Sequence, residues 1–357
     1  GDYSHFSTKH RDWTAHSLTR EGYNCLTRES LDSSKMFFSM AASKYGPSLP
    51  RREKKNCAIA MNDLGYIQLF YHQNYESAYI WLQRALQICK QEGFDETLPA
   101  ILDNMARIYE DYGDKYGALR IYKEAFHRAT HCDNWFITIM VFNDMVSMAF
   151  HHSLLDSISG EVATFCRLSI PDRPMKHFSL ELCRTISLIQ QGRHAQAAQV
   201  LERAAGSLNA EVDKPQYEIN YHRYLASTYI AAKDYGKAME NLAEGERISK
   251  DNGLNGILAN IYEAMAECQA AIRNHTQAKE YRYLALTVRD SIYTAHNFGR
   301  IKDFESSARI DSLNREIQIA DARRSHGLMI TKLLVAAILV AGAFITYIIH
   351  KNRELKA

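Results

Sequence analysis

The stretch LDNMARIYEDYGDKYGALRIYKEA, residues 102–125, sets the pattern for most of this chain. Apolar and small side chains occupy positions i, i+3, i+4 and i+7 of its first half, at Leu102, Met105, Ala106 and Tyr109. After Tyr112-Gly113-Asp114, a second stripe follows at Ala118, Tyr122 and Ala125. Each stripe has the spacing of one helix face, so the stretch predicts a helix, a tight turn and a second helix.

The same pattern returns along the chain at a nearly constant interval. Matching positions are Ala78, Leu82 and Ala85; Gly192, Ala197, Leu201 and Ala204; Leu225, Ala226, Tyr229, Tyr235, Ala238 and Leu242; and Met265, Ala266, Ala278 and Ala285. The copy that contains Ala78 follows Leu64-Gly65 and has one extra residue in the turn before Tyr75. The interval is about 40 residues, and repetition at a fixed period predicts a solenoid of stacked helix pairs.

These residues resemble the tetratricopeptide repeat (TPR), a helix-turn-helix unit with small and aromatic residues at set offsets. The matching residues are Met105, Ala106, Tyr109, Gly113, Ala118, Tyr122 and Ala125. The resemblance implies an all-α fold, a right-handed TPR superhelix of about six to seven helix pairs. The period near 40 is longer than that of the standard repeat, which predicts longer helices or loops in each unit.

The repeat pattern divides the chain into segments. We expect the TPR array to cover residues 1–290, with an N-terminal capping pair at 11–45 and a degenerate copy near 138–168. In the degenerate copy the small residues of the consensus are absent, and Pro171 and Pro174 follow it. Terminal copies in such arrays depart from the consensus because they shield the end of the core from water.

The pattern changes after the array. Residues 291–327 predict one long helix, which either caps the last repeat or forms a coiled-coil stalk that joins two chains through 301–320. Residues 328–350 contain an uncharged run, LLVAAILVAGAFITYII, long enough for a transmembrane helix. Residues 351–357 begin a polar tail, and similar numbers of basic residues flank the span, so charge alone does not orient it.

Composition limits the classes of function. The net charge is +2 and no basic stripe is present, so we expect no nucleic-acid binding by this region. The seven cysteines are widely spaced and lack a CxxC motif, which argues against a disulfide framework or a zinc finger and leans toward a reducing compartment.

No catalytic signature is present in the sequence, and we expect neither an enzyme nor a bound cofactor or metal. His127 and His131 lie four residues apart beside Cys132, but two or three local ligands without a distant partner make a weak metal site. We interpret these histidines, and His151-His152 in the degenerate copy, as solvated side chains.

The first helices of the repeats line the concave side of such arrays, and polar pairs recur there in register. The candidate ligand-binding residues are Asn62, Asp63, Tyr66, Asp103, Asn104, Arg107, Asn143, Asp144 and Arg223. They could bind the backbone of a peptide or protein ligand. The alternative, which we favour, is that they bond to neighbouring helices and hold the superhelix together. The pattern of Lys and Asn residues with which the carboxylate-clamp members bind a partner's free C-terminus is not evident.

The order of array, charged helix, span and polar tail resembles the membrane-anchored TPR regulators of Gram-negative bacteria. This resemblance implies a periplasmic sensor array and a single span that relays a signal to a cytoplasmic output absent from this chain. The alternative is a tail-anchored cytosolic adaptor that recruits protein partners to a membrane, which the free cysteines and the lack of a visible signal peptide favour.

Overall fold

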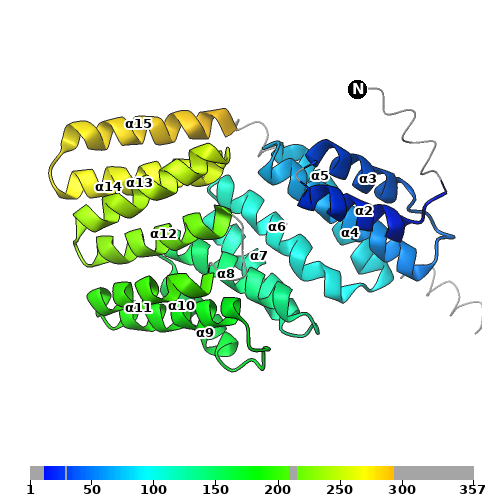
Figure 1. The fold of residues 1–357 in the computed structure, drawn as a ribbon, viewed down its shortest axis with the longest axis horizontal. Coiled ribbons are helices and arrows are strands. Elements are labelled where there is room, and N and C mark those ends of the chain that lie inside the picture. The colour runs from blue at the N-terminus through cyan, green and yellow to red at the C-terminus, as the bar shows by residue number, and fades with distance from the viewer. Residues whose placement is uncertain (1–11, 29, 209–214, 293–357) are drawn as a thin grey trace, which may run out of the picture. The chain divides into compact units, whose positions relative to one another are not determined.

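The computed structural model describes residues 12–28, 30–208 and 215–292, and every regular element in these ranges is a helix (Figure 1). The first helices of the seven pairs are α2 (Ala15–Thr27), α4 (Arg51–Phe70), α6 (Leu98–Asp111), α8 (Trp135–His151), α10 (Pro174–Gln190), α12 (Pro215–Ala231) and α14 (Asn255–Ala271). The second helices are α3 (Leu31–Ser43), α5 (Tyr75–Glu92), α7 (Lys115–Ala129), α9 (Ser159–Phe165), α11 (His194–Leu208), α13 (Tyr235–Asp251) and α15 (His275–Ile292). Two short 3₁₀ helices, η1 (Asp95–Thr97) and η2 (Leu155–Ile158), precede α6 and α9.

In six of these seven pairs the two helices pack along each other, and α8 with α9 is the exception. This all-helical architecture of repeated pairs confirms the predicted resemblance to the TPR. The consensus residues fill the positions that the pattern assigned to the core, because Ala106, Tyr109, Ala118 and Tyr122 are all buried.

A left-handed residue marks the turn inside each pair from α4 to α15. These residues are Gln73, Gly113, Ser153, Gly192, Lys233 and Arg273, with φ between 51° and 81°. They recur at intervals of 39 to 41 residues, which confirms the predicted period. A left-handed residue after the last helical turn lets the next backbone N–H bond back to the helix and reverses the chain.

Except after Ser153, the residue that follows lies directly before the first residue of the second helix. The side chains of Asn74, Asp114 and Asp234 each accept a hydrogen bond from the backbone N–H three residues on. This N-cap satisfies a helix donor that would otherwise lack a partner. The turn before Tyr75 carries the predicted extra residue, since the backbone N–H of Asn74 reaches back six residues to Gln68 whereas that of Asp114 reaches five.

Close approach within the early pairs depends on glycine. A Cβ atom on Gly65 would lie 2.6 Å from Leu82 Cγ, and one on Gly22 would lie 2.6 Å from Phe38 Cε1. Gly22 of the first pair therefore has the same role as Gly65, because both let a large side chain of the second helix lie on the first helix.

The copy near 138–168 keeps a full first helix and a very short second one. Residues 141–150 of α8 are all buried, whereas α9 has only 7 residues. The left-handed Ser153 lies in register with the other turns, so this copy keeps the repeat spacing even though its second helix is reduced.

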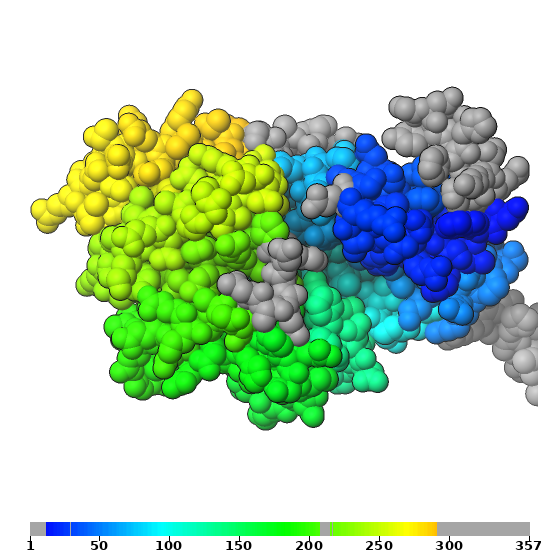
Figure 2. Space-filling model, in the orientation of Figure 1, coloured from blue at the N-terminus to red at the C-terminus, as the bar shows by residue number. Residues whose placement is uncertain are grey.

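First helices also pack on one another, α2 on α4, α4 on α6 and α6 on α8, after which α8 contacts both α10 and α12, and α12 contacts α14. The chain also returns on itself. Gln73 Nε2 donates to the carbonyl of Gly253 at 2.6 Å, and Asn255 Nδ2 donates to Gln73 Oε1 at 3.0 Å. The surface of the later pairs therefore borders that of the early pairs (Figure 2).

The predicted long helix over 291–327 and transmembrane helix over 328–350 lie almost entirely outside the described residues, which end at 292. None of the helices that the structure does describe has the length and apolar character needed to cross a bilayer.

Candidate functional site

The nine candidate residues lie on α4, α6, α8 and α12, whose facing sides we call the inner face. Because these helices pack in succession, the polar pairs on α4, α6 and α8 lie on neighbouring helices. Asn104 Nδ2 donates to Asn62 Oδ1 at 3.1 Å, and Asn62 Nδ2 donates to Asp63 Oδ1 at 3.3 Å. The first of these hydrogen bonds joins α6 to α4, and the second lies within α4.

An ion-pair cluster occupies the middle of the inner face. Arg107 on α6 is 4% exposed, and its guanidinium lies 3.6 Å from Glu110 Oε2 and 3.5 Å from Asp144 Oδ1. The Tyr122 hydroxyl of α7 donates to Glu110 Oε2 at 3.3 Å. Buried charges are stable only when they are paired, and of the two carboxylates Asp144 joins α6 to α8 while Glu110 belongs to α6 itself.

A second buried cluster links α8, α10 and α12. Arg223 Nη1 lies 3.5 Å from Ser147 Oγ and donates to Asn220 Oδ1 at 3.1 Å. The Tyr224 hydroxyl donates to the backbone carbonyl of Asn143 at 3.2 Å, and Ser179 Oγ donates to Asn143 Oδ1 at 2.8 Å. Arg223 and Asn143 therefore face the same junction between helices, which the sequence did not indicate.

Exposure divides the nine residues into two groups. The buried group, at 9% exposure or less, is Asn62, Asp103, Arg107, Asn143, Asp144 and Arg223. The half-buried group is Asp63, Tyr66 and Asn104. The Tyr66 ring also contacts the rings of Phe70, at 4.6 Å between centroids, and Tyr71, at 6.2 Å. The half-buried group is therefore the more accessible part of these nine residues.

Burial raises the pKa of several carboxyls on the inner face. Desolvation raises the pKa of Asp63 to about 7, against which hydrogen bonds from Tyr23 and Asn62 act only in part. Desolvation likewise raises the pKa of Asp111 to about 7, and the pKa of Asp103 lies well above its usual value for the same reason and because Asp144 is near. The inner face thus contains carboxyls that are partly neutral near pH 7.

The histidines differ from one another. His127 and His131 on α7 and its C-terminal turn are exposed, as expected. The interpretation of His151-His152 as solvated is wrong, because the His152 side chain is only 16% exposed and its Nε2 lies 4.0 Å from Glu110 Oε1. Burial, joined by the charge of Arg223, lowers the pKa of His151 well below its usual value. Within the described ranges no group of three or more His, Cys, Asp or Glu side chains is placed to hold a metal ion.

The sequence did not reveal how the inner face closes. Tyr75 donates to Asp111 Oδ2 at 3.2 Å, beside a small cavity of about 30 Å³ that Arg107, Asn255 and Gly256 also line. A Cβ atom on Gly256 would lie 3.2 Å from Asp111 Oδ1, so α14 approaches α6 closely there. The signal that could have pointed to this contact is the glycine itself, since a residue without a Cβ lets a neighbouring side chain lie against the backbone.

No protein-family model matches this chain, and no curated protein does. Solved structures that resemble it include a STAND signal-transduction ATPase with a tetratricopeptide repeat sensor from Pyrococcus horikoshii, at 15% identity and a TM-score of 0.42. That match covers 77% of this chain and 41% of the other, so this chain spans about two fifths of that protein. Another is a tetratricopeptide repeat protein from Parabacteroides merdae, at 14% identity and a TM-score of 0.43, covering 81% of this chain and 96% of the other. At these TM-scores the superposition is too loose to indicate a ligand or partner.

Proposed function

We propose that the array is a non-enzymatic interaction module that binds a peptide segment of a partner on the inner face. The observation that supports this most is a set of buried polar atoms that make no hydrogen bond within the described residues. They include Asp63 Oδ2, Glu110 Oε1, Asn143 Nδ2 and Arg223 Nη2. Each such atom costs about 1–3 kcal/mol, a cost that a ligand offering N–H and C=O groups removes.

Tyr66 and Asn104 are the residues we assign to direct ligand contact, with Asp63 beside them. An amide and a phenol can each bond to a peptide backbone whatever its side chains are. Arg107 itself acts indirectly, by holding α6 against α8 through Asp144. Because the face contains more carboxyls than guanidiniums, we expect the bound segment to be neutral or basic, and not an acidic chain end.

Binding there requires the array to open. The hydrogen bonds of Gln73 to Gly253 and Asn255 hold the second pair against the last one. A ligand that binds the open form more tightly shifts the population toward it, which changes the curvature of the array. Such a change is the signal that the proposed sensor relays.

Selection from a displayed peptide library tests the binding proposal. Peptides selected on the intact chain should lose about tenfold or more in affinity when Tyr66→Ala or Asn104→Ala is introduced, because each variant removes a contact in a desolvated site. Arg120→Ala is the matched control, since Arg120 is an exposed side chain on α7. Equal affinities for all three variants would contradict binding on the inner face.

For the whole chain we propose a membrane-anchored sensor with the array in the periplasm. The support is the apolar run within 328–350 and the polar helical pattern over 291–327, through which a signal would pass, with 301–320 as a dimer contact. A tail-anchored cytosolic adaptor is the second candidate. The observation that favours it is the set of seven free cysteines, five of them buried.

Cys166 offers a way to separate the two candidates, because its side chain is exposed in the folded array. In intact cells, a thiol reagent that does not cross the inner membrane should label Cys166 if the array is periplasmic. The variant Cys166→Ser reports the background from the other cysteines. Labelling only after the cells are lysed would favour the adaptor. In a separate experiment, an immunoblot of the native protein that shows a species much larger than 40.9 kDa would favour a following output domain.

A further inference from the structure

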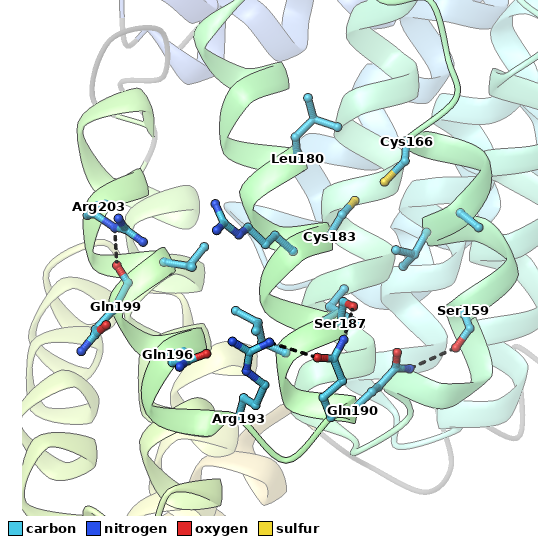
Figure 3. A pocket seen from close by; sticks show the side chains of 17 residues that line it. Ser159, Cys166, Leu180, Cys183, Ser187, Gln190, Arg193, Gln196, Gln199 and Arg203 are labelled. Atoms are coloured by element: carbon cyan, nitrogen blue, oxygen red, sulfur yellow. Dashed lines mark hydrogen bonds between the residues drawn. The ribbon is translucent and has the colours of Figure 1, made fainter.

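A groove with a volume of about 760 Å³ lies between α9, α10 and α11 (Figure 3). Helix α10 forms its floor, and α9 and α11 form its walls. Each helix contributes side chains at helical spacing, for example Ser159, Val162 and Ala163 of α9, which Cys166 follows as the C-cap. The groove is separate from the inner face, because two of its three helices are second helices.

The groove exists because the fourth pair is incomplete. Helices α3, α5, α7, α11 and α13 each pack on the first helix of the next pair, whereas α9 and α10 are not in comparable contact. Helix α9 has 7 residues and α7 has 15. At about 1.5 Å per residue, α9 is shorter by about two turns, so part of the second-helix layer is not filled there.

The groove is lined by both apolar and polar side chains. Leu180 and Val162 are half-buried, Ala163 is exposed, and Cys183 and Val200 are buried beneath them. Burial of such surface is worth roughly 25 cal/mol per Å² to a ligand. A partner with an apolar stripe therefore gains binding free energy from the apolar part of the groove.

The rim is basic. Arg184, Arg193 and Arg203 are exposed, and none of the residues that line the groove is acidic. Arg193 lies 3.4 Å from Gln191 Oε1, and Arg203 donates to the carbonyl of Gln199 at 3.2 Å. The hydrogen-bond partners of both arginines are therefore neutral groups. Arg184 has one exposed ion pair, at 3.9 Å to Glu181, and pairs of this kind contribute little.

The acidic side chains near the groove face elsewhere. Asp156 accepts a hydrogen bond from Gln190 at 3.0 Å, and Glu161 pairs with Lys123 of α7 at 3.1 Å. The positive field of the three arginines is therefore not cancelled inside the groove. Charge complementarity favours an acidic partner over a basic one.

We propose that this groove docks an amphipathic helix of a partner protein. Its apolar stripe packs on Leu180 and Val162 at the floor and wall, and its glutamates and aspartates face the three arginines. We choose a helix as the occupant because the groove has helices on three sides and lies in the layer of second helices. The side chains of these helices form ridges at i, i+3 and i+4, and the ridges of another helix can pack between them. This surface adds a second binding site to the proposed function and does not depend on the inner face.

The test uses the full chain in a nanodisc of zwitterionic lipid, with empty nanodiscs as the blank. The probe is a labelled helical peptide of about 18 residues with a leucine and alanine stripe flanked by glutamates. One control peptide has lysine in place of every glutamate, and a second has the stripe scrambled. We expect the acidic peptide to bind at least about tenfold more tightly than either control, and less tightly as salt rises.

Variants locate the binding. Arg184→Glu with Arg193→Glu should weaken the acidic peptide about tenfold or more and reverse the preference toward the lysine peptide. Ala163→Trp, which fills the groove from an exposed position, should also weaken it. Arg120→Glu should change affinity less than about twofold. No preference among the peptides, or equal losses in the groove and control variants, would overturn the proposal, and circular dichroism verifies that each variant is folded.

Cys166 distinguishes an outside partner from a segment of this same chain. If the groove is free, Cys166 reacts with a thiol reagent in the isolated chain and is protected by the acidic peptide. Protection without the peptide, together with loss of peptide binding, would overturn the partner assignment and assign the groove to another part of the chain. Loss of inner-face binding in Tyr66→Ala leaves this result unchanged, so the two proposals fail separately.

Discussion

At the residue scale, Asp63 couples the stability of the inner face to pH. Its pKa is about 7 in the folded chain against 3.8 for the ordinary carboxyl, and burial is the main cause. A raised carboxyl pKa means that the folded state binds the proton more tightly. The stability that this proton contributes is therefore complete below about pH 4 and is lost as the pH rises through 7.

We predict that Asp63→Asn flattens the pH dependence of the free energy of unfolding. At about 1.4 kcal/mol per pKa unit, the wild-type contribution between pH 4 and pH 8 is at most roughly 4 kcal/mol. Urea denaturation at both pH values measures the difference in each protein. If the variant lost as much stability toward pH 8 as the wild type does, Asp63 would not be the group responsible.

Arg107 is the residue whose removal should cost most. Its guanidinium lies within 3.6 Å of both Glu110 and Asp144, which are buried as well. Arg107→Ala leaves two buried carboxylates without their cation, and we expect a loss of about 3–5 kcal/mol in the free energy of unfolding.

Chemical denaturation at pH 7 measures this loss, and Arg120→Ala on the exposed side of α7 serves as the control. The control should change stability by less than about 0.5 kcal/mol. A small loss in Arg107→Ala would mean that the charges of Glu110 and Asp144 are solvated in solution.

Periodicity predicted which residues share the inner face, but not their partners. The pairs Asn62-Asp63 and Asp103-Asn104 were visible because they lie about one period apart, and the hydrogen bond from Asn104 to Asn62 joins them. Glu110, three residues after Arg107, could have been added as an i, i+3 partner. Tyr75 and Gln73 could not, because their contacts depend on how several helix pairs stack.

At the scale of the elements, Gly65 sets the distance between α4 and α5. A Cβ atom there would lie 2.6 Å from Leu82 Cγ and 3.3 Å from the carbonyl of Ala78. We predict that Gly65→Ala destabilises the chain by about 1–3 kcal/mol, because the added methyl group overpacks the pair.

Thermal unfolding of Gly65→Ala and Gly206→Ala compares the two situations. Nothing lies within 4 Å of a Cβ atom on Gly206, so alanine there should stabilise α11 by up to about 1 kcal/mol. Adding Leu82→Ala to Gly65→Ala removes the side chain that the new methyl group meets. The double variant should therefore recover the part of the stability that overpacking costs. Equal effects at the two glycines would show that helix propensity, and not the contact with Leu82, determines the change in stability.

The turns at Gly113 and Gly192 were predictable because glycine favours the left-handed conformation, whereas the left-handed Gln73, Ser153, Lys233 and Arg273 leave no such mark in the sequence. Gly113 and Asp114 are an example of a predictable turn, and the structure places the turn of that pair there. The short α9 was less visible. Pro171 and Pro174 indicated an interruption after the degenerate copy, but the groove beside α9 depends on how far α10 and α11 lie from it, which no local pattern specifies.

At the scale of the whole array, closure depends on few groups. Gln73 makes one hydrogen bond to Gly253 and one with Asn255. We predict that Gln73→Ala increases opening about fivefold or more, since each hydrogen bond contributes about 1 kcal/mol. Hydrogen exchange of the 252–258 backbone measures this opening.

The control for that experiment is Gln83→Ala, whose side chain bonds within α5 to the Tyr79 hydroxyl at 2.7 Å. Exchange at 252–258 should be unchanged in the control. If exchange is also unchanged in Gln73→Ala, the contact between the early and late pairs does not limit opening, and the proposed mechanism of relay loses its support.

Binding of a peptide segment to the inner face is the central claim, and a photo-crosslinking amino acid in place of Tyr66 tests it most directly. In cells that produce the intact protein, we predict a covalent adduct with a single partner segment that is neutral or basic. The same amino acid in place of Arg120 should give no such adduct. Adducts from position 120 and none from position 66 would contradict the claim, because the partner would then bind outside the inner face.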